Sequence, residues 1–174
     1  MKQLTIFEHI EKRQLAVFAI GLLLPSSAVG QSSDSEQIKR GEYLSRAANC
    51  MECHTTRGGE PYAGGRILKT PFGEFVTPNI TPDDETGLGR WSNEDFWQAL
   101  HSGKARDGSY LYPVFPYTEY TKITREDADA MFAYLRSLKA VTQTNPPHKI
   151  NSPYDNQFLL FLWRTWYFKE GVYE

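Results

Sequence analysis

The stretch Cys50-Met51-Glu52-Cys53-His54 governs the interpretation of this 174-residue chain. Cys50 and Cys53 are the only cysteines in the sequence, and a histidine directly follows the second. Two thiols at this spacing can add to the two vinyl groups on one edge of a porphyrin, and the imidazole can then ligate the iron. The motif therefore predicts one covalent haem c, attached through Cys50 and Cys53 and ligated by His54.

Three other kinds of site can use a closely spaced cysteine pair. A zinc site normally needs four ligands, yet only His101 and His148 are left beyond residue 54, without a second cysteine pair. A thioredoxin-like redox pair needs a βαβ context, which the sequence does not show. A structural disulfide is possible, but it leaves His54 and the aromatic loops unexplained.

The composition agrees with a globular domain built around a large apolar group. Aromatic residues make up 14% of the chain, a high share that suits a flat cofactor but also occurs in ordinary cores. The formal net charge is -2, so the chain has no basic footprint for nucleic acid. We therefore expect no nucleic-acid partner.

The N-terminal region has the pattern of an export signal. A positively charged start precedes the apolar run Leu15 to Leu24, which is too short to span a bilayer as a helix, and small residues follow at 28–30. We expect a signal peptide over 1–30, cleaved near Gly30, and a polar linker over 31–35. Export would place the protein in the periplasm. The alternative is an anchor that is retained.

Capping patterns predict the helices. Asp34 with Gln37 opens a helix that ends just before Cys50, Ser92 with Asp95 opens one that runs to about Ser102, and Thr124 with Asp127 caps one over 125–138. A last helix is expected from Asn156 to Lys169.

The segments between these helices are long and irregular. Residues 55–90 and 103–123 are rich in turn formers or in Tyr and Pro, and show little periodicity. Loops of this length are unusual in a compact domain unless they wrap something, and a haem would fill that role. No strand pattern is convincing. The predicted fold class is therefore all-α, with three core helices around one haem and an added C-terminal helix.

Residues 39–140 resemble a class I cytochrome c domain. They are most similar to a single haem domain from the cytochrome c subunits of bacterial periplasmic, membrane-associated dehydrogenases of the alcohol and gluconate type. Besides the cysteine motif, the stretches that carry the resemblance are Arg40 to Leu44, Thr77 to Thr81, Gly87 to Trp91, Asp95-Phe96-Trp97, Leu111-Tyr112-Pro113, Phe115-Pro116-Tyr117 and Asp127 to Leu138.

The resemblance implies that residues 36–140 form a cytochrome c domain. It also implies an electron-transfer function. The protein would be a periplasmic monohaem carrier of single electrons, the cytochrome subunit or acceptor of a dehydrogenase. It would pass electrons to a downstream cytochrome or oxidase and turn over no substrate itself.

The resemblance also implies roles for individual residues. Gly41 would contact Phe132 or Tyr134 where the first and last core helices cross. The segment 77–80 would run along the haem. Arg90 and Trp91 are candidates for contacts to a haem propionate.

One departure from the family pattern concerns the sixth iron ligand. Related domains supply a methionine from the loop before the last core helix, but here that loop contains none, and Phe115 takes its place. Lys122, Tyr117, Tyr120, His101 and water are left as candidates. The missing methionine also admits another class of function, a ligand-binding or sensor haem protein, or a peroxidase, with an open distal site.

The C-terminal part, 141–174, is a Pro-rich connector followed by the dense apolar run Phe158 to Phe168. This run is too short to span a membrane. We expect it to dock onto a dehydrogenase or another cytochrome. Packing on its own domain and contact with a membrane surface through 156–174 are the alternatives.

Overall fold

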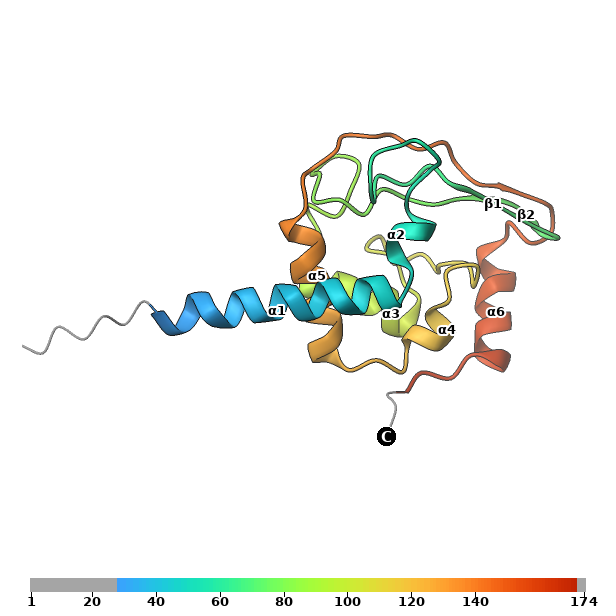
Figure 1. The fold of residues 1–174 in the computed structure, drawn as a ribbon. Coiled ribbons are helices and arrows are strands. Elements are labelled where there is room, and N and C mark those ends of the chain that lie inside the picture. Colours follow the sequence, from blue (N-terminus) through green and yellow to red (C-terminus); the bar gives the residue numbers. More distant parts are fainter. Residues whose placement is uncertain (1–27, 172–174) are drawn as a thin grey trace, which may run out of the picture.

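The computed structural model describes residues 28–171, with side chains from residue 34 onward. In chain order its elements are α1 (Ala28–Ala47), α2 (Cys50–Cys53), β1 (Ile67–Thr70), β2 (Gly73–Val76), α3 (Asn93–Ser102), α4 (Tyr117–Tyr120), α5 (Arg125–Ser137), β3 (Lys149–Ile150) and α6 (Gln157–Tyr167). Figure 1 shows α1 and α5 crossing on one side of the molecule and α6 on the opposite side, with long loops between them.

Helices α1 and α5 pack closely because Gly41 has no side chain. A Cβ atom on Gly41 would overlap the backbone carbonyl of Ala130 and lie 2.9 Å from Cβ of Tyr134. The expected contact with an aromatic residue is thus confirmed for Tyr134. Phe132 instead stacks on Phe96 inside the core, with ring centroids 4.9 Å apart.

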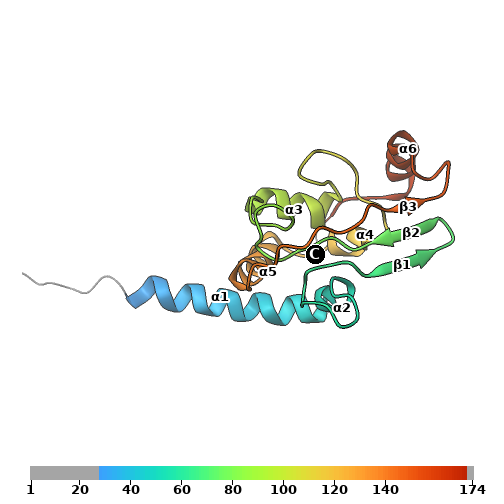
Figure 2. The same ribbon diagram turned by 90° about the horizontal axis from the view of Figure 1, so that it is seen from above.

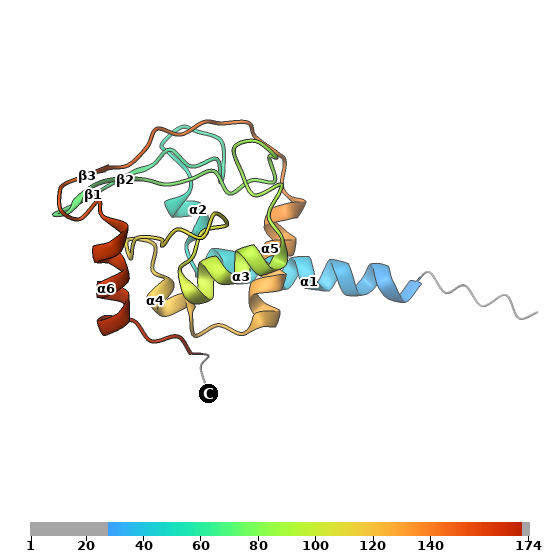
Figure 3. The same cartoon turned by 180° about the vertical axis from the view of Figure 1, so that it is seen from behind.

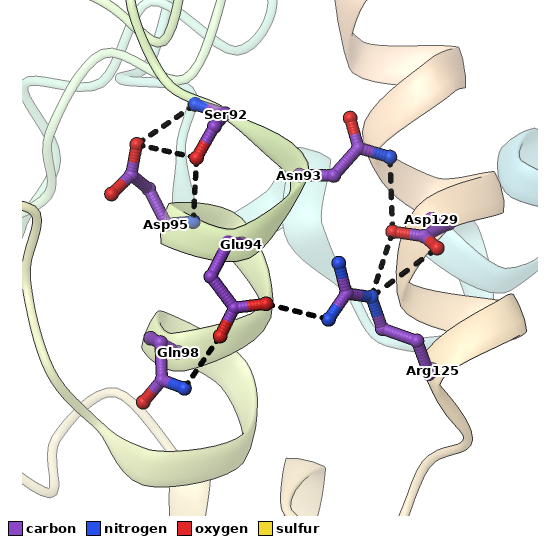
Figure 4. A network of polar contacts seen from close by, with 7 residues as sticks. All are labelled: Ser92, Asn93, Glu94, Asp95, Gln98, Arg125 and Asp129. Carbon is purple, nitrogen blue, oxygen red and sulfur yellow. Dashed lines mark hydrogen bonds and ion pairs between the residues drawn. The ribbon is translucent and has the colours of Figure 1, made fainter.

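The first turns of α3 and α5 are joined by a polar network (Figure 4). The expected capping box forms at α3, where Ser92 and Asp95 exchange hydrogen bonds. Thr124 caps α5 by accepting a hydrogen bond from the amide of Asp127, as predicted. Arg125 then donates to Glu94 at 2.7 Å and so ties the two helices together.

The prediction of an all-α fold needs correction. Residues 67–76 form a β-hairpin inside the expected loop, and β3 from the connector joins it in an antiparallel sheet of order β1-β2-β3. Figure 2 shows this hairpin projecting away from α1. The strands are only two to four residues long, which is too short for an alternating pattern to stand out.

The start of α1 differs from the prediction as well. The helix begins at Ala28, so residues 31–35 are helical rather than a linker, and Asp34 lies inside the helix instead of capping it. The predicted signal peptide falls largely on residues 1–27, which lie outside the described residues. Within the described part, no helix has both the length and the apolar character to cross a membrane.

The Pro-rich connector is bound to the loop that follows β2. The side chain of Asn79 donates to the carbonyl of Val141 at 2.7 Å, and Thr142 donates to the carboxylate of Asp83 at 2.7 Å. Asp83 also accepts hydrogen bonds from the amide and the hydroxyl of Thr86. These bonds hold two segments with little secondary structure against each other.

Asp83 should make this contact sensitive to acid. Hydrogen bonds from Thr142 and Thr86 lower the pKa of Asp83 from 3.8 to about 2. A carboxyl whose pKa is lower in the folded state than in the unfolded state stabilises the fold when the pH is above the unfolded-state pKa. This contribution is lost as the pH falls through the folded-state pKa. We expect Asp83→Asn to lower the melting temperature at neutral pH. The difference in melting temperature between this variant and wild type should become smaller near pH 2. An equal difference at both pH values would contradict this assignment.

Candidate cofactor site

The cysteine motif forms a single helical turn that presents both thiols on one face. Asn49 adopts a left-handed conformation, φ 56°, which Asn tolerates better than most residues, and so the chain turns sharply from α1 into α2. Within α2, Cys50 and Cys53 are three residues apart and therefore neighbours on the helix surface. The amide of His54 donates to the carbonyl of Cys50 at 2.9 Å, which continues the turn.

His54 is oriented by one backbone hydrogen bond. Its Nδ1 lies 2.8 Å from the carbonyl oxygen of Pro78, which can only accept, so Nδ1 carries the proton. Burial lowers the pKa of His54, against the opposite effect of this hydrogen bond, and favours the neutral ring. In that neutral ring Nε2 is unprotonated, which is the state that metal ligation requires.

Cys50, Cys53 and His54 all line one cavity of about 430 Å³. Helices α3 and α5 contribute apolar side chains to its wall, the loop before α4 contributes the segment 111–116 except Pro113, and the hairpin contributes Leu68 and Phe75. Among the described residues that line it, none is Asp, Glu, Lys or Arg. The cavity is therefore mainly apolar, and its reactive groups include the two thiols and the imidazole of the motif.

This set of groups fits a haem c. The volume lies in the range of cofactor and ligand pockets, and the apolar wall suits a porphyrin plane. Both cysteines carry free thiols, and burial raises the pKa of Cys50 to about 11, whereas a redox-active thiol needs a lowered pKa. Between residues 34 and 171, no three His, Cys, Asp or Glu side chains are grouped to hold a metal ion by themselves.

The segment expected to run along the haem lies in the cavity wall. All four residues from Thr77 to Ile80 line it, and so does Trp91. Arg90 is exposed and does not line the cavity, and a propionate contact stays a prediction for both residues.

Three of the four side chains considered for the sixth position do not line the cavity. Lys122 is paired with Glu119 at 2.7 Å on the surface, and Nδ1 of His101 lies 3.0 Å from the carbonyl of Thr121. Tyr117 is fully buried behind the cavity wall, with its ring against Phe168.

Tyr120 does line the cavity, but its hydroxyl donates to the carbonyl of Ala48 at 2.7 Å. Met131 is 3% exposed and belongs to both the core and the cavity wall. Its thioether is therefore a further candidate for the sixth position.

The sequence did not predict two groups of residues that line the cavity. His148, in the connector, lines the cavity, and its Nδ1 accepts a hydrogen bond from the amide of Val76 at 3.1 Å. The hairpin residues Leu68 and Phe75 form another part of the wall. The turn formers Pro71 and Gly73 between two short apolar stretches were the signal for this hairpin.

Comparison with known proteins gives a family and several relatives. The family model for cytochrome c matches residues 38–139. The cytochrome c subunit of the quinone-type alcohol dehydrogenase from Gluconobacter oxydans is 41% identical over 150 residues, 84% of this chain and 31% of that protein. The cytochrome c subunit of gluconate 2-dehydrogenase from Pantoea cypripedii is 37% identical over 153 residues, 87% of this chain and 35% of the relative.

A third relative is a nicotinate dehydrogenase subunit from Pseudomonas putida. It is 40% identical over 143 residues, which make up 82% of this chain but only 12% of the relative. The chain thus spans about a third or less of the length of these three proteins.

Proposed function

This chain belongs to the cytochrome c family, and we propose that it is a monohaem electron carrier of the periplasm that serves a dehydrogenase. Family membership means that the chain binds haem c covalently and transfers electrons, and that it is not itself a catalyst. What we propose beyond family membership is the number of haems, which is one, the periplasmic location and the dehydrogenase partner. The observation that carries the proposal is the convergence of both thiols and the imidazole on one apolar cavity.

Each group of the motif has a role in this proposal. Cys50 and Cys53 hold the haem through two thioether bonds, and His54 ligates the iron through Nε2 while Pro78 fixes its ring. The haem supplies one-electron redox chemistry when bound. The apolar wall keeps water away from the haem, and burial of this kind is one of the means by which a protein sets the redox potential.

The proposed partner is a membrane-associated dehydrogenase. The relatives named above are cytochrome subunits of alcohol and gluconate dehydrogenases and a subunit of a nicotinate dehydrogenase. Helix α6 packs on its own domain through Leu160 and Arg164, yet it exposes aromatic residues such as Trp166, which is 72% exposed. We propose this exposed aromatic face of α6 as part of the contact with the dehydrogenase or with a membrane surface.

The function is tested by mixing the oxidised holoprotein with membranes from its own host. We expect the haem absorbance to change to that of the reduced form when ethanol, gluconate or another dehydrogenase substrate is added. It should revert when oxygen is admitted, because an oxidase then withdraws the electrons. Reduction by ascorbate but by none of these substrates would contradict the proposed partner.

A second candidate is a haem protein that binds an external ligand at the sixth position. It is favoured by Phe115 in the cavity wall and by the engagement of the Tyr120 hydroxyl with Ala48. Carbon monoxide separates the two functions. A spectral shift of the reduced protein on adding the gas favours the ligand-binding protein. An unchanged spectrum means that a side chain such as Met131 holds the iron, as a carrier requires.

A further inference from the structure

Arg164 is a buried cation that does not line the haem cavity. The residue is only 7% exposed, although a charged side chain is costly to bury unless it has partners. Its Nη2 donates to the carbonyl of Ser102, the last residue of α3, and lies 3.9 Å from the carboxylate of Glu170. Its guanidinium carbon also lies over three aromatic rings. Together with Leu160, which is equally buried, Arg164 anchors α6 on the domain.

Two of the three rings flank one wall of the cavity. The guanidinium carbon is 4.7 Å from the ring centre of Tyr110 and 5.2 Å from that of Tyr117, and the third ring, that of Phe168, is 4.8 Å away. Between the two tyrosines, residues 111–116 supply Leu111, Tyr112, Val114, Phe115 and Pro116 to the cavity lining. Arg164 therefore holds both ends of this segment, which we call the distal wall.

Further contacts from α6 and the residues after it reinforce the same two ends. The side-chain amide of Gln157 accepts from the amide of Tyr110 at 2.9 Å and donates to its carbonyl at 3.2 Å. The ring of Phe168 packs edge-on against Tyr117, with centroids 4.9 Å apart. Figures 1 and 3 both show α6 beside the loop that precedes α4.

The distal wall has little regular structure to hold it. It contains neither helix nor strand, and Pro113 and Pro116 have no amide hydrogen to donate. The amide of Leu111 donates to the carbonyl of Gly103 at 2.8 Å, and that of Phe115 bonds only within the wall, to Tyr112. The carbonyls of Phe115 and Pro116 accept from amides of the adjacent α4. A segment whose backbone is bonded mainly to its neighbours in the chain opens readily unless it is held by other contacts.

We propose that Arg164 is a positioning residue that keeps the distal wall closed over the cofactor through Tyr110 and Tyr117. Helix α6 then acts as a clamp on the haem pocket, besides any role in docking. The word distal rests on the proposed function, because related cytochrome c domains supply the sixth iron ligand from the loop before the last core helix. The clamp itself rests only on the contacts of Arg164.

Hydrogen exchange of the full-length holoprotein tests the clamp. Because the contacts of the guanidinium with the rings of Tyr110 and Tyr117 are lost, we expect Arg164→Ala to raise the exchange rate of amides in 105–121 by about tenfold. Peptides from α1 and α5 should exchange as in wild type. Arg164→Lys, which keeps the charge, should restore part of the protection. Arg57→Ala is the matched control, because Arg57 is exposed and forms no hydrogen bond or ion pair with the described residues.

A second readout follows the haem side of the wall. Imidazole should bind to the ferric Arg164→Ala protein about tenfold faster than to wild type if the same opening limits access. The clamp is overturned if exchange rises only in 157–171, or rises equally across the whole domain. Absence of haem c from the wild-type protein would instead refute the proposed function, and the exchange comparison would still report on the clamp.

Discussion

Replacing both Cys50 and Cys53 with serine is expected to remove all covalently bound haem. A serine hydroxyl does not add to a porphyrin vinyl group, so His54 would be left as the only bond from the motif to the cofactor, and the haem would dissociate on denaturation. Haem staining of a denaturing gel and the intact mass of the chain measure this directly. Each single variant should keep one thioether bond and therefore retain part of the staining.

The matched controls lie on the same helical turn. Met51 and Glu52 sit between the two cysteines and are exposed, so Met51→Ala and Glu52→Ala should retain the haem. Haem that stays bound to the double serine variant through denaturation would mean that attachment occurs elsewhere. Equal losses in the control variants would mean that the turn, and not its thiols, is needed.

Gly41→Ala is expected to destabilise the domain by about 3 kcal/mol or more, because overpacking of this kind forces the backbone to move. The new Cβ would overlap the carbonyl of Ala130 in α5, and backbone cannot rotate away as a side chain can. At an unconstrained position in the middle of a helix, the same substitution stabilises by about 1 kcal/mol. A close helix crossing and an unconstrained position therefore predict changes of opposite sign in the free energy of unfolding. Denaturant unfolding of the holoprotein distinguishes them.

Gly171→Ala is the control for this prediction. A Cβ at Gly171 meets no heavy atom of the described residues within 4 Å, so the free energy of unfolding should change by less than about 0.5 kcal/mol. A Gly41→Ala protein that is as stable as wild type, or more stable, would show that α1 and α5 do not cross as described.

The parts that could be predicted from the sequence depend on short-range chemistry. The caps of α3 and α5 follow from pairs of residues three apart, and the motif geometry follows from one helical turn. Asn156 similarly marks the start of α6. In each case the residues that decide the structure are close together in the chain, so their pattern is visible without knowledge of the fold.

The missed features depend on contacts between distant segments. The short strands of the hairpin are supported by β3, more than seventy residues later in the chain. Which face of α6 is buried could not be predicted, because its most buried residues include Arg164, a charged side chain whose partners Ser102 and Tyr110 lie far away in the sequence. The contact of His148 with Val76 is of the same kind.

The most direct test of the central claim is the haem content of the wild-type protein, expressed with haem maturation. The intact mass after denaturation and the pyridine haemochrome spectrum should together give one covalently bound haem per chain, with the spectrum of a haem held by two thioether bonds. A chain with the mass of the bare polypeptide, or a haem released by denaturation, would contradict the assignment of Cys50, Cys53 and His54 to a haem c site.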